Sequence, residues 1–416
     1  MKELKNTRFI YISTLGYCNV FITQVIDWLH AYQEKGIIFE IWRISSLKKL
    51  LLSHQKEIDE TKLVRGIYKG TVRKLYFAPA LYLIDFIFDT FLLLYSVIPD
   101  LVKRKNIIIQ IRTSYLWRSL RFIKMISPGR VRIIFDSRAA VTEELLYSYS
   151  NKGNNFKKKI FIASTNERMM IEISDKVFCV SNVLIEYHLR KNPLTARSKY
   201  YLYPCCADSS HFYYSPEFRS QVRGQYNLEN RKVIVYSGGL ETPWHIPSKI
   251  FELFSGLHAN DENYFLIVLS PDTGIAEKYM DKFAITKDSA LIISVSNSEV
   301  VKYLCASDIA LLLRDDVPMN NVASPSKFAE YIMTGLPVII SQNVGDFSDF
   351  VKKNDLGYVF NNDFSINNIL QIHSYFDKKY GLYYKRRVNI AELGLEKYSK
   401  ASNIDEIVNQ YISLMP

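Results

Sequence analysis

Cysteine is scarce in this chain of 416 residues, which contains only five. They are Cys18, Cys179, Cys205, Cys206 and Cys305, an odd number without the paired spacing of zinc ligands. This pattern argues against a disulfide framework and against a zinc finger, and it is typical of structural thiols in a reducing compartment. We expect the adjacent Cys205 and Cys206 to be buried as small apolar residues, with a redox role as the alternative.

Long uninterrupted apolar runs are also absent. The most apolar region, residues 75–102, contains Asp85 and Asp89, and a membrane-spanning helix would have to bury both carboxylates at high cost. We therefore predict an amphipathic helix that packs on a sheet or lies on a membrane. Basic residues on both sides favour anionic lipid, and a core helix with a solvated basic rim is an equally good interpretation. These residues are Lys69, Arg73, Lys74, Lys103, Arg104 and Lys105.

Signatures of nucleic-acid and nicotinamide binding are missing as well. The chain has no Cys/His finger, no long basic helix and no Gly-rich aromatic strand motif, so its formal net charge of +11 does not indicate RNA or DNA. No Gly-x-Gly-x-x-Gly follows a predicted strand, which excludes a typical nicotinamide-dependent dehydrogenase. The charge still favours an anionic partner. We expect an acidic membrane surface and a pyrophosphate-bearing substrate.

The N-terminus carries no segment typical of a secretory signal. The apolar stretch 8–13 is too short for one and is predicted to be a strand. Together with the cysteine usage, this predicts a cytoplasmic protein, held peripherally on the inner face of the plasma membrane.

Short apolar segments alternate with amphipathic ones along the whole chain. Such alternation predicts parallel sheets with helices on both faces. The expected strands are 9–12, 37–42, 106–111, 132–135 and 175–180, then 233–237, 264–269, 290–294, 309–313 and 337–340. The expected helices include 20–34, 117–125, 182–190, 247–257, 299–306 and 384–415.

The aperiodic stretch 203–212 separates the two series of strands and is predicted to link two domains. We expect a Rossmann-like domain at 1–206, a second at 207–385, and C-terminal helices at 386–416 that cross back to the first. Two doubly wound domains in tandem would face each other across a cleft with the carboxyl ends of their strands, where ligands bind. The cleft is therefore the expected active site.

The segment 324–340 is the most informative part of the sequence. Ser324 is predicted to cap a helix and Pro325 to lie in its first turn. The free N–H groups of such a helix start suit a diphosphate, and Lys327 adds a cation. Glu330, one turn further on, can accept hydrogen bonds from two ribose hydroxyls. An ordinary capped helix before a strand is the competing interpretation.

Several segments together resemble the bacterial members of glycosyltransferase family 4, which have the GT-B fold. Their order and spacing carry the resemblance, and it covers nearly the whole chain. The segments are Ile109-Gln-Ile-Arg-Thr113, Phe135-Asp-Ser-Arg138 with the following Glu143-Glu144, Tyr236-Ser-Gly-Gly239 with Trp244, Ser324-Pro-Ser-Lys327 with Glu330, Gly335-Leu-Pro-Val338, and the helical ending 384–415.

The resemblance implies a nucleotide site in the second domain. Glu330 matches the second glutamate of the family's Glu, seven residues, Glu pattern, which binds the ribose, whereas the first falls at Val322 and is missing. The family's diphosphate-binding Arg and Lys are absent after the first strand of this domain, and Lys327 and Arg314 are the nearest substitutes. The nucleotide-binding residues are expected to be Ser237, Gly238, Gly239, Arg314, Ser324, Pro325, Ser326, Lys327 and Glu330.

The resemblance also implies catalytic and acceptor-binding residues in the first domain. The catalytic residues are expected to be Gln110, Arg112, Asp136 and Arg138, and the acceptor-binding residues Gly16, Tyr17 and Glu144. Gln110 stands where the family has a histidine, so it can donate a hydrogen bond but cannot shuttle a proton.

Structural roles are the alternative for several of these residues. Asp136 and Arg138 are alternatively a structural pair, and Arg112 an interdomain ion pair. A solvated helix face is the alternative for Glu144 and the favoured interpretation for Glu143. A lone histidine such as His245 is more often structural than catalytic.

The expected function is therefore transfer of a sugar, as by a hexosyltransferase, from a nucleoside diphosphate sugar to a lipid-linked or saccharide acceptor. UDP is the favoured nucleotide, and the resemblance implies synthesis of a bacterial surface polysaccharide such as capsule or O-antigen with retention at the anomeric carbon. No cofactor or metal is expected, because Asp315 and Asp316 are adjacent and need not converge. The alternatives are a catalytically silent sugar-nucleotide-binding or scaffold protein and a nucleotide-sugar epimerase.

Overall fold

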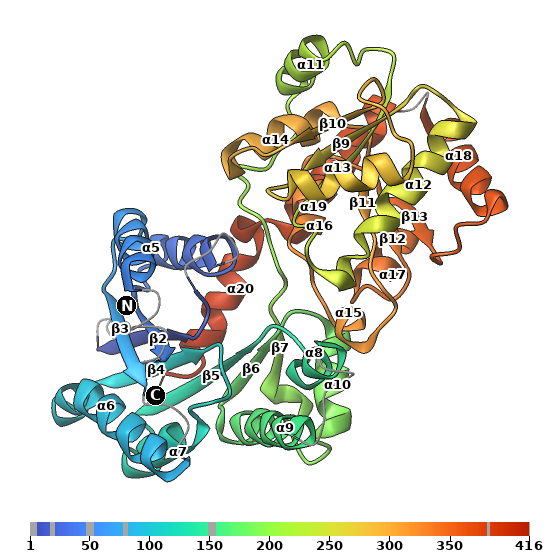
Figure 1. The fold of residues 1–416 in the computed structure, drawn as a ribbon. Helices are drawn as coiled ribbons and strands as arrows, with labels where there is room; N and C mark the ends of the chain where they lie inside the picture. The colour runs from blue at the N-terminus through green and yellow to red at the C-terminus, as the bar shows by residue number, and fades with distance from the viewer. Residues whose placement is uncertain are drawn as a thin grey trace. The chain divides into compact units, whose positions relative to one another are not determined.

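The computed structural model describes residues 6–16, 21–46, 54–77, 82–148, 155–380 and 383–415. The chain divides into two compact units, both drawn in Figure 1. The first comprises Met1–Pro204 and Asn403–Pro416, and the second is Cys205–Ser402. Residues 386–402 thus belong to the second unit, and only the end of the chain joins the first.

The first unit is built on a seven-stranded sheet. Its strands are β1 (Thr7–Ser13), β2 (Phe39–Ser46), β3 (Val72–Phe77), β4 (Asn106–Ile111), β5 (Val131–Ser137), β6 (Lys176–Cys179) and β7 (Tyr200–Leu202). They lie in the order β3-β2-β1-β4-β5-β6-β7, and every neighbouring pair is parallel. Both faces of the central strands are buried, which explains why these strands are almost wholly apolar.

Helices cover this sheet. They are the π-helical turn η1 (Ile22–Ile26), α3 (Asp27–Glu34), α5 (His54–Ile67), α6 (Tyr82–Val102), α7 (Trp117–Ile126), α8 (Val141–Ser148), α9 (Asn155–Ile173), α10 (Asn182–Lys191), the short η2 (Arg197–Lys199) and the end of α20 (Lys400–Ile412). Figure 1 shows α6 and α7 side by side, and α7 also packs on α9. The Oγ of Ser181 caps α10 by accepting a hydrogen bond from the N–H of Leu184 at 3.0 Å.

The second unit contains a six-stranded parallel sheet. Its strands are β8 (Lys232–Ser237), β9 (Tyr264–Leu269), β10 (Ala290–Ile293), β11 (Ile309–Leu312), β12 (Val338–Ser341) and β13 (Gly357–Phe360), in the order β10-β9-β8-β11-β12-β13. Its helices are α11 (Pro216–Gln225), η3 (Pro243–His245), α12 (Pro247–Asn260), α13 (Thr273–Lys282), α14 (Asn297–Ala306), α15 (Pro318–Asn321), α16 (Lys327–Met333), α17 (Phe347–Lys353), α18 (Ile366–Tyr380) and α19 (Tyr383–Tyr398).

Alternate residues of the second sheet pack into two separate hydrophobic cores. Val233 and Val235 of β8 pack with α14 and α16, whereas Ile234 and Tyr236 pack with α12 and α13 on the opposite face. This follows from the two-residue period of a strand. The fold is therefore two Rossmann-like units with helices on both faces of a parallel sheet, and the fold class expected from the sequence is confirmed.

The sequence prediction was wrong at the start of the apolar region. Residues 75–77 were expected to be helical, but they end β3, which pairs in parallel with β2 from Val72 to Phe77. The helix begins only at Tyr82. Tertiary pairing with β2 decides the conformation there, because a short apolar run is compatible with either element.

Two further helix predictions need correction. Within the expected helix 20–34, residues 22–26 form a π-helical turn before the α-helix begins at Asp27. The expected C-terminal helix 384–415 is broken at Ser399, where the backbone forms a parallel bridge with Ala207. The bridge supplies Ala207 with hydrogen bonds to Tyr398 and Lys400, and it separates α19 from α20.

Cys205 and Cys206 are both buried, at 4% exposure each, and like Cys179 and Cys305 they are not joined in a disulfide. In the described part of the chain, no helix combines the length and the apolar character that a membrane crossing requires.

Candidate functional site

The carboxyl ends of three strands in the second unit fix the backbone of Arg314. Its N–H donates to the Oγ of Ser341 at 2.9 Å, and its carbonyl accepts from the amide of Asn362 at 2.9 Å. The Oγ of Ser341 in turn donates to the amide oxygen of Asn362 at 2.7 Å. Arg314 follows β11, Ser341 ends β12 and Asn362 follows β13. This triangle places the Arg314 side chain at the edge of the sheet where ligands bind.

The side chain of Arg314 is buried, and its guanidinium lacks hydrogen-bond partners within the part of the chain that the structure describes. The residue is 7% exposed, and among the described residues its Nε and Nη1 have no hydrogen-bond partner. Burial lowers its pKa to about 10, against the opposing influence of Tyr236 and Tyr331. A buried cation with spare donors is costly unless an anion completes its environment.

Lys327 brings a second cation to the same place. It is the first residue of α16, and its ammonium lies 4.4 Å from the centre of the Tyr236 ring and donates to that hydroxyl at 3.4 Å. Burial, followed by the charge of Arg314, lowers the pKa of Lys327 to about 7, although Glu330 opposes the shift. The protein itself therefore stabilises the charged form of this ammonium only weakly.

The glycine loop after β8 leaves room for these cations. Gly238 has φ of 136°, and a Cβ built on it would lie 2.5 Å from the Nζ of Lys327. Two hydrogen bonds hold the loop: the N–H of Ser237 donates to the hydroxyl of Tyr331 at 2.9 Å, and the hydroxyl of Tyr236 donates to the carbonyl of Gly239 at 2.8 Å. A side chain at position 238 would displace Lys327 and strain the loop.

Arg314 and Lys327 thus form a cationic pair without a carboxylate partner. Among the described residues neither makes a salt bridge, and Glu330 is the acidic group that acts on Lys327. Two like charges close together disfavour each other. The arrangement suits a ligand that carries two or more negative charges.

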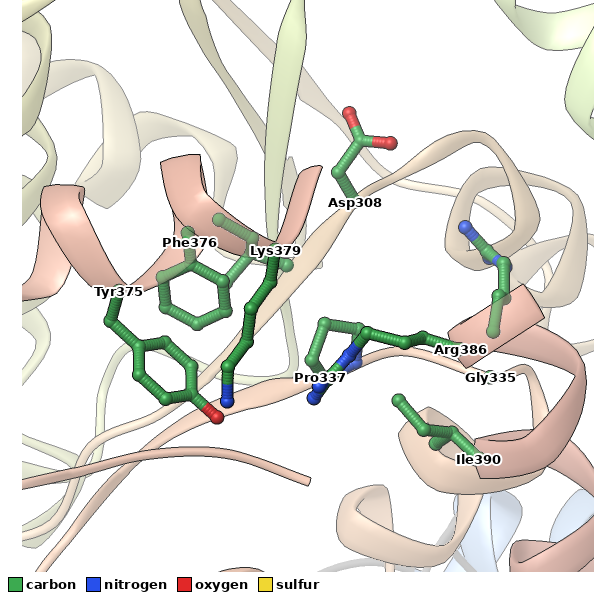
Figure 2. A pocket seen from close by; sticks show the side chains of 10 residues that line it. Asp308, Gly335, Pro337, Tyr375, Phe376, Lys379, Arg386 and Ile390 are labelled. Carbon is green, nitrogen blue, oxygen red and sulfur yellow. The ribbon is translucent and has the colours of Figure 1, made fainter. Parts of the chain in front are cut away.

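A pocket elsewhere in the second unit contains cations that do have a carboxylate partner. Figure 2 shows Tyr375, Lys379 and Arg386 around it, near the amino ends of β11 and β12. Lys379, Arg386 and Tyr375 all bind the carboxylate of Asp355. Burial opposes ionisation of Asp355, but these hydrogen bonds prevail and lower its pKa to about 2. The cavity holds about 30 Å³, space for a water or two. Unlike Arg314 and Lys327, both Lys379 and Arg386 form a salt bridge with a carboxylate.

The capping prediction at Ser324 was wrong. α16 begins at Lys327 with Ser326 as its N-cap, and the cap makes no side-chain hydrogen bond. The Oγ of Ser324 instead accepts from the N–H of Cys205 at 3.4 Å. Pro325 lies in the turn before the helix, where its carbonyl accepts from Phe328 at 3.1 Å. α16 is short, with seven residues.

Asp136 is the centre of a hydrogen-bond network in the first unit. It ends β5 at 1% exposure and accepts from the hydroxyl of Tyr11 at 2.8 Å and from the amide of Gln110 at 3.1 Å. The Nε of Arg138 donates to its other oxygen at 2.6 Å. The guanidinium of Arg138 also lies 4.4 Å from the ring centre of Tyr203. These contacts hold Arg138 in one orientation after the strand.

Gln110 has no access to a ligand in this structure. It is fully buried, with its amide nitrogen on Asp136 and its amide oxygen accepting from the hydroxyl of Tyr411. Gln110 therefore orients Asp136. Tyr411 comes from α20, whose end belongs to the first unit.

Arg112 and Glu144 are the predicted first-unit residues whose polar groups remain available to a ligand. The Nη2 of Arg112 donates to Gln24 in η1 at 2.7 Å, and its buried Nη1 has no hydrogen-bond partner among the described residues. Burial raises the pKa of Glu144, against the opposing charge of Arg112. Glu143, by contrast, accepts from Tyr187 and Lys191 at 3.0 Å each, which fits a structural role.

Two predicted residues remain to be placed. Gly16 follows β1, and a Cβ built on it would lie 3.5 Å from the guanidinium of Arg43. Tyr17 lies outside the described residues. Within those ranges no group of three or more His, Cys, Asp or Glu side chains is arranged to hold a metal ion.

Four residues that build the second site were not predicted. Tyr236 belongs to the segment Tyr236-Ser-Gly-Gly239 that carries the resemblance, but it was not named as a binding residue, and Tyr331, Ser341 and Asn362 carry no motif. A polar residue at the end of a buried strand was the available signal for Ser341. Asn362 gave none, since its role depends on tertiary contacts.

Comparisons with known proteins support this arrangement of the fold. No protein-family model matches the chain, and no curated protein matches its sequence. Solved structures do match over 98% of the chain. One is Alr3699/HepE from Anabaena in complex with UDP, with 10% identity, all of its chain covered and a TM-score of 0.71. Another is a glycosyltransferase from Rickettsia africae, with 12% identity, 98% of its chain covered and a TM-score of 0.72.

A third match is WaaG, a glycosyltransferase involved in lipopolysaccharide biosynthesis. The identity is 12%, the TM-score is 0.59, and the alignment covers 96% of this chain and 99% of WaaG. At these identities the likeness establishes the fold, which is that of GT-B glycosyltransferases.

Proposed function

We propose that this protein is a glycosyltransferase that uses a nucleoside diphosphate sugar, with UDP favoured, and that the second unit binds the donor. The observation that carries the proposal is the pair formed by the buried Arg314 and the partly buried Lys327 beside Gly238, which makes no salt bridge to a carboxylate among the described residues. A diphosphate would supply the missing negative charge. Structures of HepE with UDP and with UDP-glucose are among those with this fold, which supports the choice of ligand.

The chemistry follows from the same pair. Departure of a nucleoside diphosphate places negative charge on its terminal phosphate, and fixed cations stabilise that charge as it develops. Arg314 and Lys327 take this role in the proposal, so no metal is required. In a retaining reaction the departing phosphate accepts the proton of the acceptor hydroxyl, and no strong protein base is needed. Resemblance to retaining family members supports this choice.

The first unit is proposed to bind the acceptor. The Nη1 of Arg112 has no hydrogen-bond partner within the described ranges, and Glu144 lies within the electrostatic influence of Arg112. The two therefore offer a donor and an acceptor for a saccharide. Asp136 fixes the orientation of Arg138, and Gln110 in turn orients Asp136, so Gln110 and Asp136 act as positioning residues. We retain domains 1–206, 207–385 and 386–416 as the proposed functional division.

Replacement of Glu330 tests the ribose assignment. We expect Glu330→Ala to weaken binding of UDP and of uridine alike by about 1–3 kcal/mol, because both ligands carry the ribose hydroxyls. Isothermal titration calorimetry on the folded variant measures this. Glu299→Ala, which changes a carboxylate on the exposed first turn of α14, is the matched control. Unchanged affinity for both ligands in Glu330→Ala would remove Glu330 from the site.

The titration of Lys327 predicts how affinity depends on pH. In the free protein its pKa is about 7, because burial disfavours the charged form, and a bound diphosphate must raise that pKa. Below pH 7 the ammonium is already charged. Above pH 7 each binding event takes up a proton, so UDP affinity should fall by up to about tenfold per pH unit. Calorimetry at pH 7, 8 and 9 in two buffers of different ionisation enthalpy detects the uptake, and a pH-independent affinity would contradict it.

The acceptor is proposed to be lipid-linked, with the protein docked on an anionic membrane during surface polysaccharide synthesis. The support lies on α6, where Ile87, Phe91, Tyr95, Ile98 and Val102 recur at helical spacing and are 46–75% exposed. A stripe of this kind is typical of a helix that lies in a membrane interface. Lys103 and Arg104 follow it directly and are exposed.

Removing the apolar stripe tests membrane docking. We expect Ile87→Ser, Phe91→Ser and Ile98→Ser, combined, to abolish sedimentation with anionic vesicles, since the apolar contact is lost. High salt should weaken sedimentation of the unchanged protein. The control replaces three exposed apolar residues elsewhere, Leu194, Ile366 and Leu370, with serine. Equal sedimentation of both triple variants would argue against docking through α6.

A second candidate function is a catalytically silent binding protein. It is favoured by Val322, which occupies the place of the family's donor-sugar glutamate and is 3% exposed. Incubation with a panel of UDP-sugars and lipid-pyrophosphate acceptors separates the two. Product formation supports the transferase, and UDP binding without product supports the silent protein. Conversion of the donor sugar alone would indicate the epimerase.

A further inference from the structure

A large hollow lies at the amino-terminal edge of the first sheet, opposite the edge that carries Asp136. It encloses about 640 Å³. Its floor is formed where β1, β2 and β3 begin, and α6 forms its wall with Tyr95, Ser96, Pro99 and Asp100. A space of this size accommodates a small polar molecule of several rings or a lipid headgroup.

The deep part of this hollow contains one cation and two carboxylates. Arg8 bridges two carboxylates, because its guanidinium binds Glu40 at 2.7 and 2.9 Å and Asp100 at 2.5 Å. Burial opposes ionisation of Glu40, but Arg8 prevails and lowers its pKa, and the pKa of Asp100 is likewise lowered despite burial. Both carboxylates are therefore ionised acceptors near neutral pH.

The rim of the hollow carries two further cations. Arg73 lies 3.5 Å from Glu40 and Lys105 lies 3.1 Å from Asp100, and their side chains are 46% and 41% exposed. Three cations thus face two carboxylates in the lining. The outer pair is exposed enough to bind a phosphate in addition to its present partners.

The apolar stripe of α6 runs into the same hollow. Tyr95 lines the hollow and is 75% exposed, and Phe91 and Ile98 of the stripe are its neighbours one turn away on either side. A ligand seated between Arg73 and Lys105 would therefore have an exposed apolar track beside it. This combination of phosphate-binding cations, ionised hydroxyl acceptors and an apolar track has the chemistry of an anionic phospholipid.

We propose that this hollow binds the headgroup of an anionic phospholipid with free hydroxyls, of the phosphatidylglycerol class. The phosphate lies between Arg73 and Lys105, the hydroxyls donate to Glu40 and Asp100, and the acyl chains follow α6 along Phe91, Tyr95 and Ile98. The proposal rests on the membrane docking proposed above. It adds a defined headgroup site to the general electrostatic attraction between the basic residues and an anionic membrane.

The test separates a headgroup site from general electrostatics. The variant Arg73→Gln/Lys105→Gln removes two charges from the rim, and the matched control Lys103→Gln/Arg104→Asn removes two exposed charges beside the same helix end but outside the lining. Each protein is titrated with short-chain phosphatidylglycerol and phosphatidylcholine below their micelle concentrations, and separately with vesicles of each lipid. The conservative variant Arg73→Lys/Lys105→Arg checks that folding and charge are retained.

The expected result is loss of at least tenfold in affinity for short-chain phosphatidylglycerol in the rim variant only. The control and the conservative variant should keep wild-type affinity, and phosphatidylcholine should bind weakly throughout. Equal effects of the two charge-removing variants would overturn the headgroup site while leaving docking through α6 intact. Wild-type binding to the short-chain lipid without vesicle binding would support the site and refute the docking proposal. Absence of both overturns both.

Discussion

Replacing Lys327 or Arg314 with methionine is expected to weaken UDP binding by roughly 30- to 4000-fold. Removing one partner from a desolvated charge pair costs about 2–5 kcal/mol, and each 1.4 kcal/mol is tenfold in affinity. Calorimetry with UDP and uridine measures the effect. Uridine lacks the diphosphate and should bind the variants as it binds the unchanged protein, in contrast to the expected behaviour of Glu330→Ala.

The same replacement should not harm the free protein. Burial holds the pKa of Lys327 at about 7, below its ordinary value of 10.5, so the charged form is disfavoured by folding. That penalty is fully present below pH 7 and disappears as the pH rises towards 10.5. Lys327→Met should therefore be at least as stable as the parent in urea at pH 7. The exposed Lys278→Met of α13 is the control for both measurements. Unaltered UDP affinity in a folded Lys327→Met variant would refute the diphosphate assignment.

Replacing Asp136 with asparagine is expected to lower the free energy of unfolding by about 3–5 kcal/mol. The substitution keeps the shape of the side chain but leaves the guanidinium of Arg138 buried beside a neutral group, with side-chain exposures of 7% and 0% for the pair. Urea denaturation followed by circular dichroism measures the change. The control is Asp281→Asn on the exposed face of α13.

Donor binding offers an independent readout of Asp136→Asn. Asp136 belongs to the first unit and the diphosphate pair to the second, so a folded Asp136→Asn protein should keep its affinity for UDP while losing transfer to the acceptor. A stability change below about 1 kcal/mol would show that the network around Asp136 does not hold a desolvated charge.

Much of the fold could be predicted because its strands are local apolar runs. β4 and β9 were expected at 106–111 and 264–269 and lie at those positions. β3 could not be predicted in the same way, since it is an edge strand that contains Arg73 and Lys74 and depends on pairing with β2. The chain is apolar across the break between β3 and α6, and periodicity alone does not locate the boundary.

The site was predicted in part. Arg314 and Lys327 could be named from their places after a strand and before a helix. The lack of a carboxylate partner for these two cations could not be predicted, because it depends on which residues tertiary packing keeps out of the site. The capping role of Ser324 was wrong for a related reason: the turn that contains Pro325 delays the helix to Lys327 and leaves Ser324 to bind Cys205.

A crystal structure of the protein with UDP tests the central claim most directly. The account predicts that the diphosphate lies within hydrogen-bonding distance of the Nζ of Lys327 and of the guanidinium of Arg314, beside Gly238, with the ribose hydroxyls on Glu330. A diphosphate bound elsewhere, with Lys327 and Arg314 left without a ligand, would contradict it.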